Sequence, residues 1–258
     1  MVRLRSPAPY GSVPEWPKGA DCKSVVCDFG GPNPPAPTRK ALSKESAFSF
    51  YNQTKRKIFK MYIYLIRHGK DDETVRGGWS NSPLAEEGVL QVKKLVDMLE
   101  KRKEAFAIKH IFSSDLPRAI QTANPIAEML GLEVVYQPLF REVNNGDLAG
   151  MKNEIAVKRY PGLFWNTLAW DEKYPNGESP KDFFERVSHA WTELEKTFSR
   201  NENVILVTHS GVIQVILSLA EGKVYSNKGI IRKIGNAEMI KVQYDCNLKR
   251  YEVQNERN

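Results

Sequence analysis

Hydrophobic residues between positions 61 and 258 occur in two patterns that alternate along the chain. Short runs rich in β-branched and aromatic residues, typical of buried strands, occupy 62–66, 110–113, 133–136 and 204–208. Apolar residues at helical spacing fill stretches that begin near 84, 116, 180 and 210. Two further runs, 237–244 and 249–253, are typical of an antiparallel pair. Strands that alternate with helices predict a three-layer α/β/α sandwich around a mostly parallel central sheet.

The predicted helices carry end signals. Pro117 stands in the first turn of a helix expected at about 116–130, and Gly131 follows its last residue. Ser179 and Asp182 have the spacing of a capping box, in which each side chain accepts a hydrogen bond from the backbone N–H of the other. We therefore expect another helix to start at about residue 180.

The first 40 residues show neither pattern, and they contain eight of the 15 prolines. Such a stretch cannot bury enough apolar surface to offset its chain entropy, so we predict a disordered tail over 1–60 and a folded domain over 61–258. Cys22 and Cys27 lie in the tail without a second cysteine or histidine pair. A metal clip there is therefore the weaker hypothesis.

The formal net charge of +7 resides in the same tail. Residues 1–60 hold 11 basic and four acidic residues, and the remaining chain holds 27 of each. The folded domain is thus neutral overall, and we expect it to bind no nucleic acid. No apolar run approaches the roughly 20 residues of a membrane span, and three cysteines make no disulfide framework. These features predict a soluble protein of the reducing cytoplasm without a membrane partner.

The codons of the tail suggest a further hypothesis. Residues 21–24, Asp-Cys-Lys-Ser, can be encoded by GACTGTAAATCT, which contains the anticodon GTA of a tyrosine transfer RNA. A transfer-RNA gene read as protein would leave Met61, just before the first predicted strand, as the true start, and 1–60 as a spurious upstream extension. Coding DNA that cannot fold as a cloverleaf across these codons would reject this hypothesis.

Two predicted strands end in a histidine. His68 follows the strand at 62–66, and His209 follows the strand at 204–208. Ligands of open α/β sheets bind beyond the carboxyl ends of the strands. We therefore expect the two histidines to share one pocket. His110 and His189 lie on a predicted strand and a predicted helix face, where a structural role is expected.

Four sequence blocks in this order resemble the histidine phosphatase superfamily, also called the phosphoglycerate mutase-like family, and specifically its phosphatase branch. The blocks are Leu-Ile-Arg-His-Gly at 65–69, Ser-Ser-Asp-Leu-Pro-Arg-Ala-Ile-Gln-Thr-Ala at 113–123, Arg-Glu at 141–142 with Gly-Asp at 146–147, and Val-Thr-His-Ser-Gly at 207–211. A lone Arg-His-Gly would be weak evidence. The resemblance covers essentially all of 61–258.

The resemblance implies a set of site residues. His68 would be the nucleophile that forms a phosphohistidine, and Glu142 would protonate the leaving oxygen and then activate water. Arg67 and Arg118 would bind phosphate oxygens with planar donor forks, and His209, most useful when protonated, would be a further phosphate ligand. The resemblance implies neither a metal nor another cofactor.

Several positions depart from the family pattern. Lys70 and Asp71 follow the Arg-His-Gly triplet where Glu-Thr is frequent, and Thr74 stands where an Asn contributes to the phosphate pocket. Ala85 replaces a frequent Thr at the start of a helix, which costs about 1 kcal/mol of helix stability. Residues 146–150 lack the frequent Trp-Glu pair. These differences concern substrate choice more than catalysis.

The sequence therefore predicts an enzyme, a metal-independent phosphomonoester hydrolase acting on a small phosphorylated metabolite. A phosphoglycerate mutase is the second hypothesis, but mutases usually carry a longer basic insertion after the Glu block. The corresponding region here, 151–174, is more aromatic than basic, with Phe164, Trp165 and Trp170. A catalytically weak phospho-ligand-binding module on the same fold is the third hypothesis. The oligomeric state is left open.

Overall fold

The structure, a computed structural model, describes residues 60–197, 202–245 and 250–254. Residues 1–59, with Cys22 and Cys27, and Cys246 near the end of the chain lie outside the described residues. The disordered tail therefore stays a prediction.

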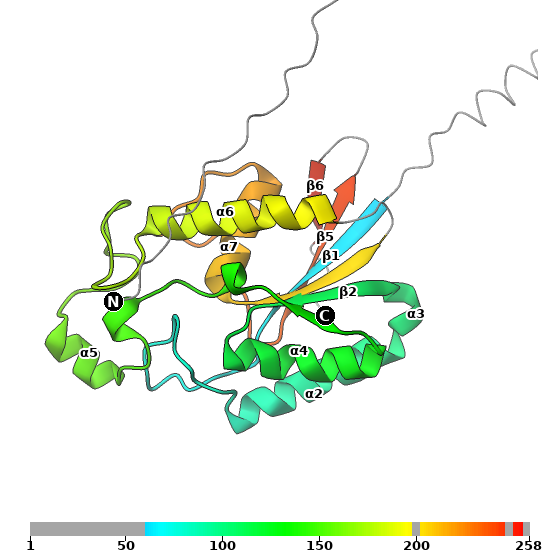
Figure 1. The fold of residues 1–258 in the computed structure, drawn as a ribbon, viewed down its shortest axis with the longest axis horizontal. Helices are drawn as coiled ribbons and strands as arrows, with labels where there is room; N and C mark the ends of the chain where they lie inside the picture. The colour runs from blue at the N-terminus through cyan, green and yellow to red at the C-terminus, as the bar shows by residue number, and fades with distance from the viewer. Residues whose placement is uncertain (1–59, 198–201, 246–249, 255–258) are drawn as a thin grey trace, which may run out of the picture. The chain divides into compact units, whose positions relative to one another are not determined.

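The core is a six-stranded sheet with the order β3-β2-β4-β1-β5-β6 (Figure 1). The strands are β1 (Lys60–Arg67), β2 (Ile108–Ser113), β3 (Val134–Tyr136), β4 (Asn203–Thr208), β5 (Met239–Asp245) and β6 (Arg250–Gln254). β1 pairs in parallel with β4, β4 with β2, and β2 with β3, while β5 runs antiparallel to both β1 and β6. The predicted mostly parallel sheet, with an antiparallel pair at the end of the chain, is confirmed.

The strands at the centre of the sheet are apolar on both faces because both faces are covered. In β1, Ile63 and Leu65 contribute to one hydrophobic cluster, and Tyr64 and Ile66 contribute to another. β4 alternates in the same way. This two-sided burial explains why these strands appear in the sequence as continuous hydrophobic runs instead of an alternation with polar residues.

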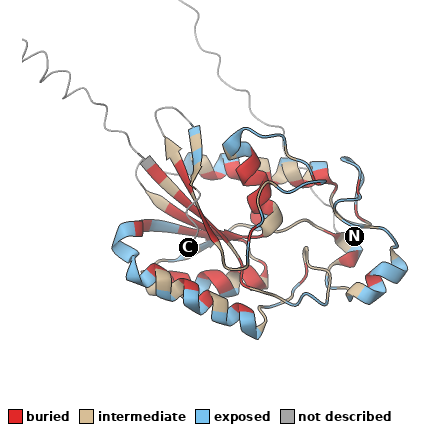
Figure 2. Cartoon of the chain, turned by 180° about the vertical axis from the view of Figure 1, so that it is seen from behind, coloured by how far each residue is buried: buried red, intermediate tan, exposed pale blue. Residues whose placement is uncertain are grey.

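Helices cover both faces of the sheet (Figure 1). The helices are α2 (Glu86–Lys101), α3 (Lys103–Phe106), α4 (Pro117–Leu130), α5 (Asn153–Arg159), α6 (Pro180–Thr197) and α7 (Ser210–Glu221), with short 3₁₀ turns η1 (Pro138–Phe140) and η2 (Gly146–Leu148). α2, α3 and α4 pack in one cluster, and α6 and α7 in the other. In α7 seven consecutive residues, 212–218, are buried, so this helix is enclosed on all sides, whereas α2 has many exposed residues on its outer face (Figure 2). The three-layer sandwich is confirmed.

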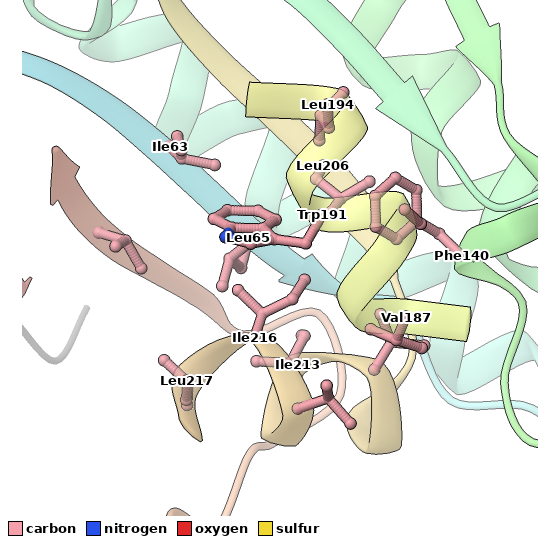
Figure 3. Packing of buried hydrophobic residues seen from close by; sticks show 14 of the residues in the cluster. Ile63, Leu65, Phe140, Val187, Trp191, Leu194, Leu206, Ile213, Ile216 and Leu217 are labelled. Atoms are coloured by element: carbon pink, nitrogen blue, oxygen red, sulfur yellow. The ribbon is translucent and has the colours of Figure 1, made fainter. Parts of the chain in front are cut away.

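The larger cluster lies between the sheet and the helices α6 and α7. Trp191 of this helix is almost fully buried, and its indole lies among Ile63, Leu65 and Ile216 (Figure 3). The capping box that begins α6 is confirmed: the backbone N–H of Asp182 donates to Ser179 Oγ at 3.1 Å, and that of Ser179 donates to Asp182 Oδ2 at 3.1 Å. No helix in the described part of the chain is long and apolar enough to cross a membrane.

One local expectation was wrong. β1 begins at Lys60, so Met61 lies inside the strand, where it is buried and pairs with Tyr244, and not before it. The apolar pattern of the first helix includes Val89, yet this side chain is 55% exposed, because α2 buries only the narrower face that carries Val92, Leu95 and Leu99.

Candidate active site

The carboxyl ends of β1, β4 and β2 bring His68, His209 and Ser114 to the same edge of the sheet. The backbone N–H of His68 donates to Thr208 O at 3.0 Å, and that of Ser114 donates to Val207 O at 3.0 Å. These bonds extend the strand pairing to the residues that carry the site. The two histidine rings lie 5.0 Å apart between centroids, so the predicted shared location is confirmed.

His68 is held as a neutral imidazole whose lone pair lies on Nε2 and accepts a hydrogen bond from Arg118. Its Nδ1–H donates to the carbonyl oxygen of Gly69 at 2.7 Å, which leaves Nε2 unprotonated. Burial, followed by the positive charge of Arg118, lowers the pKa of His68 to about 3. Arg118 Nε lies 3.3 Å from Nε2 and donates to it.

His209 is fully buried and bonded on one side only. Its Nε2 lies 2.8 Å from Ser114 Oγ, which itself accepts the backbone N–H of Leu116 at 3.3 Å. In the tautomer in which the Ser114 hydroxyl donates to Nε2, the ring proton lies on Nδ1. Among the described residues, Nδ1 has no hydrogen-bond partner. Burial, followed by the positive charge of Arg118, lowers the pKa of His209 well below its usual value, which disfavours the protonated form in the free site.

Two arginines flank the histidines. Arg118 is 1% exposed, and its two terminal nitrogens donate to Gly78 O at 2.7 Å and to Ser80 O at 3.2 Å. Arg67 is half-buried, and one terminal nitrogen donates to Ile234 O at 2.7 Å. Its buried Nε has no partner among the described residues. Arg67 Nε and His209 Nδ1 are thus two buried donors that an anion can satisfy.

A carboxylate that the family pattern does not contain lies beside this cluster. Asp71 Oδ2 is 3.3 Å from Arg118 Nε, and the Asp71 side chain is 16% exposed. It follows β1 closely, and a bridge pairs it with Leu84, whose backbone N–H donates to Gln121 of α4 at 2.7 Å. Thr74 is turned elsewhere: its backbone N–H and hydroxyl both bond to Asp72 in an exposed turn. Arg118 therefore already has a negative partner.

Glu142 lies at the start of a loop that returns to the same edge. Its Oε2 accepts the backbone N–H of Gly211 at 3.0 Å, and Oε1 accepts that of Val143 at 3.1 Å. Gly211 belongs to the first turn of α7, two residues after His209. A Cβ atom at position 211 would lie 2.3 Å from Glu142 Oε1, so a glycine is required for this close approach.

The backbone of Glu142 is fixed from two further sides. Trp79 Nε1 donates to its carbonyl oxygen at 2.7 Å, and Arg186 donates to the same oxygen at 3.1 Å. Arg186 is itself held by two bonds to the Glu178 carboxylate, at 2.6 and 2.9 Å. This network rigidly positions the carboxyl group relative to α7.

A cavity of about 680 Å³ adjoins this carboxyl group. Glu142 and Gly211 line it, together with Arg76, Lys228 and a wall of apolar and aromatic side chains: Val143, Leu148, Leu163, Phe164, Trp165, Tyr174, Phe183, Tyr225 and Ile230. Tyr174 has its pKa raised to about 12, mainly by burial. The cavity can hold an organic group next to Glu142.

The region 151–174, called the cap below, supplies much of this wall. Phe164 and Trp165 line the cavity, while Leu168 is buried in the cap and Trp170 packs against Phe184 and Tyr225 outside it. The cap is fastened to the segment after α7, since Asn227 Nδ2 donates to the carbonyl oxygens of Trp165 and Leu168.

The structure thus brings Arg67, His68, Arg118 and His209 into one cluster, with Glu142 bonded to the helix that follows His209. Sequence reasoning missed Ser114, Asp71 and the group around Glu142: Trp79, Glu178 and Arg186. Ser114 stands inside the second block and Trp79 outside all four, and only the fold shows the contacts of both. His110 lies away from the site on β2, where it contacts Glu202. No group of three His, Cys, Asp or Glu side chains that could hold a metal ion occurs within the described ranges.

Comparison of the sequence with known protein families agrees with this fold and this cluster. The profile of the histidine phosphatase superfamily (branch 1) matches residues 63–257. The chain belongs to this superfamily, and the resemblance noted in the sequence is confirmed.

Known proteins similar to this chain include both phosphatases and mutases. The 2,3-bisphosphoglycerate-dependent phosphoglycerate mutase 2 of Lactobacillus johnsonii is 28% identical over 227 residues, which cover 75% of this chain and 96% of that protein. The uncharacterized phosphatase PhoE of Bacillus subtilis is 29% identical over 163 residues, which cover 62% and 77%. Among solved structures, a mycobacterial glucosyl-3-phosphoglycerate phosphatase is similar with a TM-score of 0.63 and 25% identity, covering 75% of this chain and 97% of that one.

Proposed function

We propose that the protein hydrolyses phosphomonoesters through a phosphohistidine on His68. The observation that carries this proposal is the state of His68: a neutral imidazole whose Nδ1–H is bonded to Gly69 O, so that the lone pair of Nε2 faces Arg118. A nucleophile needs an unprotonated nitrogen, and the pKa of about 3 leaves Nε2 unprotonated at neutral pH, with the hydrogen bond from Arg118 Nε to be displaced by the substrate.

The first step forms a bond between His68 Nε2 and phosphorus and breaks the bond between phosphorus and the ester oxygen. Arg67, Arg118 and the Nδ1–H of His209 donate to the phosphoryl oxygens and stabilise the charge that develops on them. The carboxyl group of Glu142 gives its proton to the leaving oxygen, and the alcohol departs into the neighbouring cavity.

The second step restores the enzyme. The Glu142 carboxylate takes a proton from water, the water oxygen attacks phosphorus, and the bond between phosphorus and Nε2 breaks. Inorganic phosphate leaves, and His68 is again neutral. No other reactant is needed, since the proton given by Glu142 in the first step returns to it in the second.

Trapping the intermediate tests the proposal. Rapid acid quenching during turnover of a ³²P-labelled aryl phosphate would destroy a phosphohistidine, so the protein is quenched in alkali instead. Label that is stable in alkali and released by acid is expected in the wild type and absent in His68→Gln. His110→Gln, at an exposed histidine on β2, is the control and should retain the label. Label that survives in His68→Gln would overturn the assignment.

A mutase is the second candidate, favoured by the similarity to a phosphoglycerate mutase over nearly the whole length of that protein. A bisphosphoglycerate-dependent mutase depends on a bisphosphorylated compound, whereas a phosphatase releases phosphate from a simple ester alone. Phosphate release from an aryl phosphate without any bisphosphoglycerate would support hydrolysis. Isomerisation of a phosphoglycerate that exceeds phosphate release would support the mutase.

A further inference from the structure

Arg76 is a cation in the wall of the cavity for which the proposed reaction has no use. It lies in the segment between β1 and α2, where its backbone N–H donates to Met151 O and its carbonyl oxygen accepts the N–H of Gly150, both at 2.8 Å. These two bonds fix the position of the residue against the segment that leads into the cap.

The guanidinium of Arg76 contacts an aromatic ring and no carboxylate. Its central carbon lies 4.8 Å from the ring centroid of Phe164, which also lines the cavity. Among the described residues no ion pair involves Arg76, and its buried Nε has no hydrogen-bond partner. Burying part of a guanidinium without an acceptor is costly, so the arrangement favours an anionic ligand at this position.

The other charged groups of the cavity wall differ from Arg76. Lys228 Nζ donates to Leu168 O at 2.5 Å and so fastens the cap. Glu142, the acid of the proposed reaction, is bonded to the backbone N–H groups of Val143 and Gly211. Lys228 keeps two further N–H donors, but Arg76 is the cation of this wall with a buried nitrogen that has no acceptor among the described residues.

Arg76 also lies within reach of a bound phosphate ester. Arg118, in the phosphate cluster, donates to the carbonyl oxygen of Gly78 at 2.7 Å. Gly78 is two residues from Arg76, a separation of at most about 7 Å between Cα atoms. A substrate with a single ring between its phosphate and a second anionic group spans distances of this order.

On the basis of the proposed function, we infer that the substrate is a phosphomonoester with a flat apolar body and a carboxylate, and that Arg76 binds the carboxylate. Phe164, Trp165 and Tyr174 provide the apolar surface for the body. A single guanidinium fork matches the two oxygens of a carboxylate, whereas the dianionic phosphate is met by the larger cluster at Arg67 and Arg118.

Matched esters test this inference on the full-length protein. The esters are meta- and para-carboxyphenyl phosphate and the corresponding carboxamides, which have almost the same shape without the charge. The wild type is expected to prefer the better-fitting carboxylate over its carboxamide by about tenfold or more in kcat/KM, mainly through KM, because a charge-assisted hydrogen bond contributes this much. Arg76→Gln is expected to abolish the preference.

Arg159→Gln is the matched control. Arg159 also stacks on an aromatic ring, with its central carbon 5.6 Å from the Tyr160 centroid, but it is exposed on α5 outside the cavity wall. This variant should keep the preference of the wild type. Equal kcat/KM values for the carboxylate and carboxamide esters, or a preference that survives in Arg76→Gln, would overturn the inference. The proposed hydrolysis of phosphomonoesters would not be affected by either result. If no ester is hydrolysed and no label is trapped, the proposed function fails, and this inference fails with it.

Discussion

The pKa values of His68 and His209 are lowered for the same physical reason, although the hydrogen bonds of the two rings differ. Each is buried at the carboxyl end of a central strand, next to the guanidinium of Arg118, and both burial and a neighbouring positive charge disfavour the imidazolium form. The site is therefore built with two permanent cations, Arg67 and Arg118, and two neutral rings. A histidine that stays neutral at these positions can offer its lone pair or its N–H to a phosphate.

The depressed pKa of His68 makes the stability of the folded protein depend on pH. Between about pH 6.5, the ordinary value, and about pH 3, the unfolded chain binds a proton at His68 that the folded protein does not. The stabilising contribution is thus complete above pH 6.5 and is lost as pH falls toward 3, by up to about 1.4 kcal/mol per pH unit. Urea unfolding of the wild type and His68→Gln from pH 7.5 to 5 measures this slope.

His68→Gln is expected to show a shallower loss of stability with falling pH than the wild type. The matched variant His110→Gln changes an exposed histidine on β2 and should retain the wild-type slope. Parallel curves for the wild type and His68→Gln would contradict a depressed pKa at His68.

Gly211 is expected to be essential because Glu142 occupies the space of its missing side chain. Gly211→Ala would place Cβ 2.3 Å from Glu142 Oε1, so the carboxyl group must move. If Glu142 protonates the leaving oxygen, kcat for phenyl phosphate should fall about a hundredfold, and kcat for p-nitrophenyl phosphate, whose leaving group needs little protonation, should fall much less.

Gly229→Ala is the control for this substitution. Gly229 also lines the cavity, but a Cβ atom there would meet nothing within 4 Å. Both substrates should be hydrolysed by this variant as by the wild type. An equal loss for both substrates in Gly211→Ala would indicate general disruption and not displacement of an acid.

At the scale of elements, the two long helices that flank the sheet begin in opposite ways. α6 begins with a reciprocal capping box between Ser179 and Asp182, whereas the N-cap residue of α2, Ala85, makes no side-chain hydrogen bond to the helix. The extended backbone of Ala85, with φ −71° and ψ 164°, already has the conformation of an N-cap residue. The missing hydroxyl is therefore a local loss of stability that can be repaired.

Ala85→Thr is expected to stabilise the protein by about 1 kcal/mol, because its hydroxyl can accept a backbone N–H in the first turn of α2. Ala85→Val has nearly the same shape without the hydroxyl and is the control. Urea unfolding at neutral pH compares the three proteins. A gain in Ala85→Val as large as that in Ala85→Thr would assign the effect to packing instead of capping.

The elements were predictable from the sequence where a local signal defines them, and the contacts between distant segments were not. The buried strands β1 and β4, the end of α4 at Gly131 and the capping box at Ser179 each depend on the local sequence, and all of them were predicted. Ser114 bonds to His209 across 95 positions, and Asp71 approaches Arg118 across 47. No periodicity encodes such pairs, because they depend on strand order and on the paths of loops. The exposure of Val89 on α2 has a related reason: helical spacing gives the apolar face of a helix but not the width of its contact.

For the whole molecule, the separation of charge between the tail and the folded domain has a consequence for binding. Residues 61–258 carry 27 basic and 27 acidic side chains, so no large net charge attracts anions from a distance. Affinity for a phosphate group must come from the few donors gathered at one edge of the sheet. Those donors belong to β1 with its following loop, to α4 and to the start of α7, which are packed in both hydrophobic clusters. Binding one small anion should therefore stabilise the domain as a unit.

Orthovanadate, an analogue of phosphate, is expected to raise the melting temperature of the wild type. A ligand bound only by the folded state at a hundred times its Kd contributes about 2.7 kcal/mol, which corresponds to several degrees for a domain of this size. Arg118→Gln should lose most of the shift, because it removes the donors nearest His68. Arg102→Gln is the control and should keep the shift, since Arg102 lies at the end of α2, where its guanidinium stacks on Phe106 of α3. Since Asp71 already pairs with Arg118, Asp71→Asn is expected to respond at lower vanadate concentrations than the wild type. A shift retained in Arg118→Gln would show that the stabilising anion binds somewhere other than this cluster.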